Sequence, residues 1–162
     1  MARIYLSIGS NIEREKNIRG GVEDLKRHFG EVTLSRVYES ESVGFDGDNF
    51  YNLVAAIDTD MSAKSVSDTL HAIEAEHGRT REGPRFSSRT LDIDLLTYDD
   101  LVTNDNGLQL PRDEITKNAF VLWPLAEIAP QEKHPVLNQT YDEMWEEFDK
   151  ERQSLWPVEF QW

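Results

Sequence analysis

The apolar positions of the chain follow two different periods in turn. Strict alternation of apolar and polar residues predicts strands, and apolar residues that recur at helical spacing predict helices. The predicted strands span residues 3–8, 32–38, 50–57 and 91–98, and the predicted helices span 18–29 and 61–77, with glycines as stops. The resulting β-α-β-β-α-β order predicts an α+β fold, a ferredoxin-like α/β sandwich in which an antiparallel or mixed sheet carries helices on one face.

The C-terminal part of the chain adds elements to this core. Residues 120–125 are apolar without a clear period, so a helix and a buried strand both fit. Residues 140–143, Thr-Tyr-Asp-Glu, form a capping box and predict the start of a helix. The last eight residues are rich in aromatic side chains, and we expect them to pack back onto the domain. Residues 108–110 form an edge strand at most, and residues 39–49 form a long polar loop.

Length and composition limit the class of protein. A chain of 162 residues fits one domain, residues 1–162. The formal charge of −14 opposes binding to nucleic acid or to an anionic membrane, and no apolar run is long enough to span a bilayer. The chain has no cysteine and no visible signal peptide, so we expect a cytoplasmic protein. We also expect a monomer that binds small molecules.

Two aspartates interrupt the predicted strand 91–98. Asp92 and Asp94 should project from one face of the strand, while Leu91, Ile93 and Leu95 pack on the other. Carboxylates at this spacing repel each other, and a hard cation such as Mg²⁺ would neutralise them. Two solvent-facing acids on an exposed sheet face are the simpler interpretation of such a pair when it is taken alone.

The segment before these aspartates concentrates positive charge. Arg79, Arg81, Arg85 and Arg89 lie within eleven residues. Guanidinium groups grip phosphate oxygens bidentately, so the arginines beside a metal-binding pair indicate phosphoryl-transfer chemistry. A basic loop that makes surface ion pairs with an acidic protein is the alternative.

Two residues of the strand 50–57 suggest a binding face. Phe50 and Asn52 should share one side of that strand, which places a stacking ring beside an amide. A core aromatic residue beside a turn amide explains the same spacing equally well. The four histidines show no metal-ligand spacing, and the chain contains no Walker A loop.

Several motifs together resemble one known family. They are Ile8-Gly9-Ser10-Asn11, the segment Arg89-Thr90-Leu91-Asp92-Ile93-Asp94 and the apolar segment from Phe120 to Pro130. This combination resembles the 6-hydroxymethyl-7,8-dihydropterin pyrophosphokinases of the folate pathway over nearly the whole chain. The resemblance implies a ferredoxin-like fold and transfer of pyrophosphate from ATP to the pterin hydroxymethyl group, with two Mg²⁺ ions.

The resemblance also implies roles for individual residues. Asp92 and Asp94 would hold both metal ions and, with Arg79 and Arg89, form the catalytic set. The implied nucleotide-binding residues are Glu74, Arg79, Arg81, Arg89 and Arg112. The implied pterin-binding residues are Asn52, Phe50, Phe120, Val43 and Ser40.

Three positions depart from the family pattern. Arg112 stands where the family has a histidine, and Asn118 stands where it has an arginine. Residues 40–42 replace a Thr-Pro-Pro stretch, which makes the pterin loop more acidic and less rigid. These changes leave open a paralogue that acts on a modified pterin or another acceptor, and a protein that binds pterin or nucleotide without catalysis.

Overall fold

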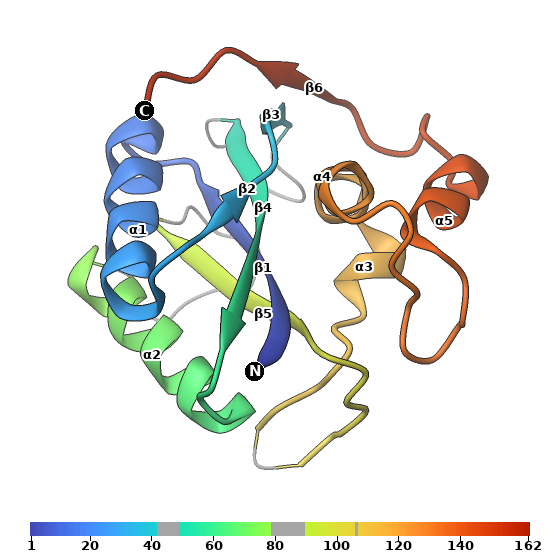
Figure 1. Cartoon of the computed structure of the whole chain (residues 1–162). Helices are drawn as coiled ribbons and strands as arrows, with labels where there is room; N and C mark the ends of the chain where they lie inside the picture. Colours follow the sequence, from blue (N-terminus) through green and yellow to red (C-terminus); the bar gives the residue numbers. More distant parts are fainter. Residues whose placement is uncertain (42–48, 79–89, 106) are drawn as a thin grey trace.

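A single antiparallel sheet runs through the centre of the protein. The computed structural model describes residues 1–41, 49–78, 90–105 and 107–162. Its strands lie in the order β5-β1-β4-β3-β6, and β2 also pairs with β4 (Figure 1). The strands are β1 Ala2–Ser10, β2 Thr33–Leu34, β3 Val37–Ser40, β4 Phe50–Thr59, β5 Asp92–Tyr98 and β6 Leu155–Val158.

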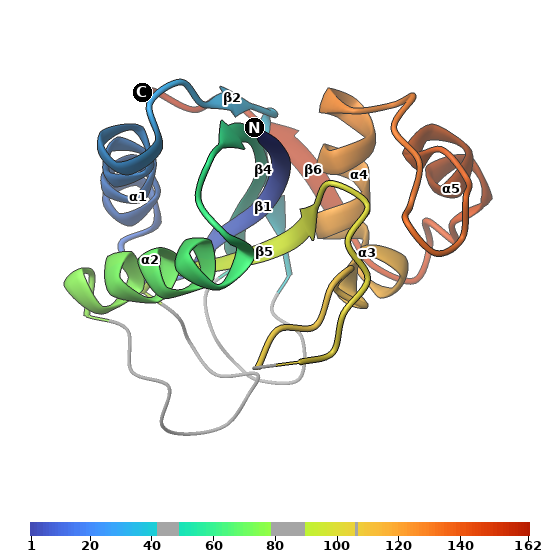
Figure 2. The same ribbon diagram turned by 60° about the horizontal axis from the view of Figure 1, so that its bottom comes forward.

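Helices cover both faces of this sheet. The helices are α1 Arg14–Phe29, α2 Ala63–Glu76, α3 Glu114–Lys117, α4 Ala119–Ile128 and α5 Tyr141–Glu147. Figure 2 shows α1 and α2 on one side of the sheet and α3, α4 and α5 on the other. Two separate apolar cores result, one between the sheet and α1/α2 and one between the sheet and the C-terminal helices. The predicted helices of the core, α1 and α2, lie on one face as expected, and the C-terminal additions cover the second face.

The predicted fold class is confirmed. The order β5-β1-β4-β3 with antiparallel neighbours places β1 and β4 at the centre, as the split-βαβ arrangement requires. The paired residues of β1 and β4 run without interruption from Ala2↔Thr59 to Ser10↔Tyr51. The C-terminal strand β6 then extends the sheet beyond β3. None of the described helices is long and apolar enough to cross a membrane.

The apolar segment 120–125, for which a helix and a strand were both open, is helical. It lies in α4, which packs between the sheet and α5, so apolar residues occur around most of the helix and mask its period. The predicted strand 32–38 is split into β2 and β3, and residues 108–110 contribute only an isolated bridge, Thr103↔Leu110. The capping box at Thr140 and the packing of the C-terminal tail are confirmed.

Candidate functional site

The aspartate pair lies at the start of β5 with the predicted alternation. Leu91, Ile93 and Leu95 belong to the core beneath α1 and α2. Asp92 and Asp94 point to the other face and are only partly buried. The interpretation of two faces for this strand is confirmed, and the pair stands where the sheet is not covered by the first helical layer.

The alternation of β5 continues past the aspartates to Leu96. Leu96, two residues after Asp94, lies on the same face and packs in the second core. The pairing with β1 shifts at this point, because Tyr5 lies opposite Thr97 whereas Leu6 lies opposite Leu95, so Leu96 is the additional residue. One face of the strand thus carries carboxylates at its start and an apolar side chain further along.

The electrostatics of the pair favour a cation. Burial, together with the charges of Asp92 and Glu74, raises the pKa of Asp94 to about 7, against the opposing effect of Arg112. A carboxyl group in such surroundings ionises at a cost in stability unless positive charge is added. Oxygen ligands of this kind suit Mg²⁺.

Glu74 of α2 places a third carboxylate against the backbone between the two aspartates. Its side chain is only 2% exposed, and its Oε2 accepts a hydrogen bond of 2.8 Å from the backbone N–H of Ile93, which lies between the two aspartates. This bond fixes the last turns of α2 against the start of β5. The structure thus brings Glu74 together with the pair, as expected from its assignment to the nucleotide side.

A row of residues crosses the sheet from the aspartates to Asn52. Gly9 lies opposite Asn52 on β4 and opposite Asp92 on β5, so all three occupy one line on one face. A Cβ at Gly9 would lie 3.1 Å from Asn52 Oδ1. The glycine therefore permits the close approach of the amide and leaves the middle of the row without a side chain.

The amide of Asn52 is held by Ser40. Asn52 Nδ2 donates a buried hydrogen bond of 2.7 Å to Ser40 Oγ on β3. Ser40 lies opposite Phe50, so the predicted pterin-binding residues of β3 and β4 are neighbours on one face. This confirms that Phe50 and Asn52 share a side of β4.

Arg112 lies in the connection between β5 and α4, and Phe120 lies in α4 itself. Phe120 lies in the first turn of α4 and is partly buried against the second core. The backbone N–H of Arg112 donates to Leu96 O at 2.9 Å, and its guanidinium forms a two-point ion pair with Glu114, with Nε–Oε2 2.7 Å and NH2–Oε1 3.2 Å. The positive charge of Arg112 lowers the pKa of Asp94. The hydrogen-bonding edge of the Arg112 guanidinium, however, is occupied by Glu114.

Four predicted site residues lie outside the described part of the chain: Arg79, Arg81, Arg89 and Val43. Within the described part, no group of three or more His, Cys, Asp or Glu side chains surrounds a common point. The described donors for a metal are therefore the two aspartates, a set that suits Mg²⁺ when phosphate oxygens and water complete its shell. The Oγ1 of Thr90, just before β5, is buried without a hydrogen-bond partner among the described residues.

This geometry agrees with the comparison to known proteins. Residues 5–130 match the family model described as 7,8-dihydro-6-hydroxymethylpterin-pyrophosphokinase. The chain belongs to this pyrophosphokinase family. The model ends at Pro130, so residues 131–162, which form α5, β6 and the tail, lie beyond it.

Individual relatives in the pyrophosphokinase family are similar over most of their length. The 2-amino-4-hydroxy-6-hydroxymethyldihydropteridine pyrophosphokinase of Methylorubrum extorquens is 40% identical over 134 residues, 80% of this chain and 84% of that protein. The protein with the same name from Pseudomonas aeruginosa is 36% identical over 137 residues, 82% of this chain and 84% of that protein.

Solved structures support the fold of this pyrophosphokinase domain. A crystal structure of HPPK-DHPS in complex with substrates matches with a TM-score of 0.73 at 11% identity and covers 93% of this chain. This chain covers only 44% of that longer one. A Plasmodium falciparum HPPK-DHPS structure gives a TM-score of 0.72 at 16% identity, over 93% of this chain and 44% of that one. At such identities the likeness shows the fold alone.

Sequence reasoning missed a polar cluster that joins α4 to the sheet. Glu127 accepts hydrogen bonds from the Tyr38 hydroxyl and from Arg36, with Nε–Oε1 2.9 Å and backbone N–Oε2 2.8 Å. Tyr38 lies opposite Asn52, and its ring packs on Trp123 of α4 at 4.8 Å between centroids. The only signal in the sequence was a glutamate inside an apolar segment, which indicates a buried polar contact without naming its partner.

Proposed function

We propose that this protein transfers a pyrophosphoryl group from ATP to the hydroxymethyl group of 6-hydroxymethyl-7,8-dihydropterin, a step of folate biosynthesis. The hydroxymethyl oxygen bonds to the β-phosphorus of ATP, the bond from that phosphorus to the oxygen of the α-phosphate breaks, and the hydroxyl proton is released. The products are AMP and the pterin diphosphate. One observation carries the proposal: the Asp92/Asp94 pair lies on the face of β5 that points away from the α1/α2 core, in a chain whose residues 5–130 match the pyrophosphokinase family.

Asp92 and Asp94 are proposed to hold two Mg²⁺ ions. When bound, the ions would neutralise charge on the phosphates and orient them for displacement. Burial and the charge of Asp92 make the Asp94 carboxylate costly without a cation, which supports this role. Glu74 fixes the backbone between the two aspartates through Ile93 and so keeps their spacing constant.

The nucleotide is proposed to lie on the α2 side of this pair. Arg79, Arg81 and Arg89 would contact its phosphates, since guanidinium groups match phosphate oxygens in charge and shape. Arg112 would add positive charge near Asp94, although its ion pair with Glu114 must open before it can grip a phosphate. These roles rest on the family resemblance and on the charges of the residues.

The pterin is proposed to bind at the other end of the row, on β3 and β4. The Oδ1 of Asn52 would accept from the donor edge of the pterin, while its Nδ2 is held by Ser40. Phe50 and Phe120 supply aromatic rings for stacking, and Val43 would complete the apolar lining. The hydroxymethyl group of a pterin bound here would point along the row toward the aspartates.

The direct test is an assay of the purified protein with ATP, Mg²⁺ and 6-hydroxymethyl-7,8-dihydropterin, with AMP measured by chromatography. AMP formation that requires all three components supports the proposal. AMP formation only with a different acceptor would indicate a paralogue of altered specificity. ATP binding without AMP formation from any pterin would overturn the enzymatic proposal.

A further inference from the structure

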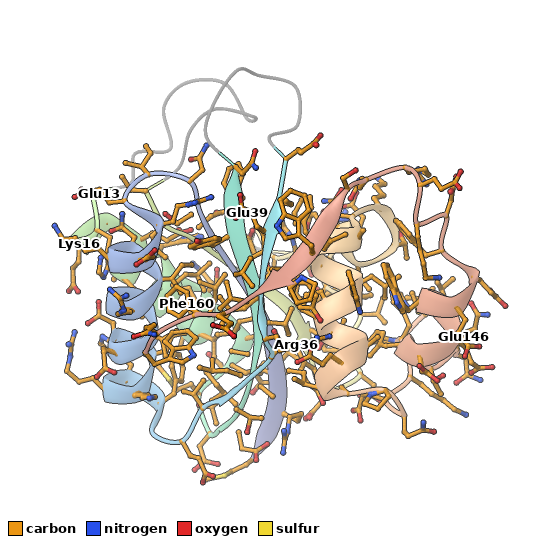
Figure 3. All side chains as sticks on the ribbon, turned by 90° about the horizontal axis from the view of Figure 1, so that it is seen from above. Glu13, Lys16, Arg36, Glu39, Glu146 and Phe160 are labelled. Atoms are coloured by element: carbon orange, nitrogen blue, oxygen red, sulfur yellow. The ribbon has the colours of Figure 1, made fainter. Side chains whose placement is uncertain are left out.

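The C-terminal segment, residues 131–162, attaches to each element that carries a proposed pterin-binding residue. Its strand β6 pairs with β3, where Ser40 lies opposite Leu155. Its Phe160 packs edge-on against Tyr51 of β4, with ring centroids 6.0 Å apart. Figure 1 shows the segment crossing the molecule from α5 to the C-terminus beside α1, and Figure 3 shows Phe160 next to α1.

A third attachment is made by Gln153 at the junction between α3 and α4. Its Oε1 accepts a hydrogen bond of 2.7 Å from the backbone N–H of Ala119. Its Nε2 donates to Lys117 O at 3.1 Å and to Asn118 Oδ1 at 3.3 Å. One half-buried amide thus binds three consecutive residues of the junction.

This contact supplies a helix cap that the local sequence lacks. Asn118 is the residue before α4, but its side chain makes no capping bond to the helix. The first N–H groups of a helix have no intrahelical partner and normally receive one from the residue that precedes the helix. In this protein Gln153, thirty-four residues away in the sequence, provides the acceptor instead.

The residue that follows the capped N–H is Phe120. A helix whose first turn frays does not hold its side chains in one orientation, and a stacking ring must be held in place before the ligand arrives. The cap therefore affects how firmly Phe120 is held in the first turn of α4. Asn118, which replaces the arginine expected from the family pattern, is drawn into the same contact.

We infer that Gln153 is a positioning residue for the acceptor half of the site: it caps α4 from the C-terminal segment and holds Phe120 in place for the pterin. The inference rests on the proposed function. It assigns a role in substrate binding to a segment beyond the family match. It also predicts a separation of effects, because the aspartates of β5 do not depend on this cap.

The test compares steady-state kinetics of Gln153→Ala, Gln153→Glu and the wild type. Loss of the cap in Gln153→Ala should raise KM for the pterin by about 5- to 10-fold, with KM for ATP within about 2-fold of wild type. Gln153→Glu keeps an acceptor for Ala119 N–H and places negative charge at a helix N-terminus, so it should restore KM for the pterin to near the wild-type value. Gln161→Ala is the matched control. Gln161 is exposed, and its contact with Arg19 uses its backbone carbonyl oxygen, which alanine retains.

The outcomes separate the inference from the proposed function. If the wild type forms AMP but Gln153→Ala has an unchanged KM for the pterin, the cap is only structural and the inference fails. A parallel rise in KM for ATP would also overturn it, because the effect would then not be confined to the acceptor half. A wild type that forms no AMP would overturn the proposed function itself.

Discussion

The two halves of the site differ in how their polar groups are satisfied. On β5, burial and neighbouring carboxylates raise the pKa of Asp94, because its ionised form would add negative charge to a place that already carries it. On β3 and β4, the amide of Asn52 is already held by Ser40 through a buried hydrogen bond of 2.7 Å. A bound cation would therefore stabilise the carboxylate half, whereas the amide of the acceptor half is already held in place by the protein.

The difference indicates how the two substrates would be recognised. A half with excess negative charge would attract the Mg²⁺ ions that accompany the nucleotide, and through them the phosphates. A half with fixed hydrogen-bonding groups discriminates by shape and by donor–acceptor pattern, because unmatched buried polar groups are costly. We therefore expect substitutions in the first half to affect turnover and those in the second to affect acceptor binding.

The largest expected effect comes from the carboxylate pair. Asp92→Asn or Asp94→Asn removes a charge needed to hold Mg²⁺, and kcat for AMP formation should fall by about 100-fold or more. The control is Asp100→Asn, in the exposed turn after β5, which should keep wild-type turnover. Near-normal turnover in Asp92→Asn or Asp94→Asn would contradict the assignment of metal binding and turnover to the carboxylate half.

A smaller and different effect is expected at Asn52. Asn52→Ala should lower kcat/KM for the pterin by about 10- to 100-fold through loss of a buried amide contact, and KM for ATP should stay near its wild-type value. Ser40→Ala leaves the amide present but unfixed and should give a smaller rise in pterin KM. Asn104→Ala, at an exposed position, serves as the control. Equal changes in the kinetic constants for the pterin and for ATP would contradict the separation of the two halves.

The negative charge of the carboxylate half should lower the free energy of unfolding of the wild type when Mg²⁺ is absent. Without Mg²⁺, Asp94→Asn is expected to stabilise the fold by roughly 1 kcal/mol or more, about 3 °C in melting temperature for a chain of this size. Because the folded-state pKa of Asp94 is raised, its ionisation destabilises the wild type increasingly as the pH rises from about 4 to about 7. The gain should be near zero below pH 4 and complete above pH 7, measured by calorimetry in EDTA. A loss of stability at pH 8 would contradict it.

The smallest effect is expected behind the acceptor half, at Glu127. Burial alone would raise the pKa of Glu127, but hydrogen bonds from Tyr38 and Arg36 outweigh it and lower the pKa. A lowered pKa gives stability that is present above the ordinary value near 4.5 and is lost as the pH falls through the folded-state value. Glu127→Gln should therefore cost about 1 kcal/mol at pH 7 and less at pH 3.

Calorimetry at both pH values checks the prediction for Glu127. The matched control is Glu146→Gln on α5, where the glutamate is exposed (Figure 3). A cost for Glu127→Gln that is equal at pH 7 and pH 3 would show that the hydrogen bonds from Tyr38 and Arg36 do not depend on the ionised carboxylate.

The sequence predicted the carboxylate half well and the acceptor half only in part. Alternation along a single strand was enough to place Asp92 and Asp94 on one face, because the strand period of two is a local property. The pairing of Asn52 with Ser40 depends on the register between β3 and β4, and no local period encodes a register between strands. The motifs named both residues through the family resemblance, but they did not show that one fixes the other.

The sequence by itself therefore determined the order of elements, the family and the two faces of β5, since these follow from local periods and short motifs. The tertiary structure decided that the second face of the sheet is covered by α3, α4 and α5. The apolar segment 120–125 has no clear period, so the sequence did not indicate which elements it packs against. The tertiary structure also decided that Gln153 caps α4 and that Glu127 joins α4 to β3, since both contacts connect residues far apart in the sequence.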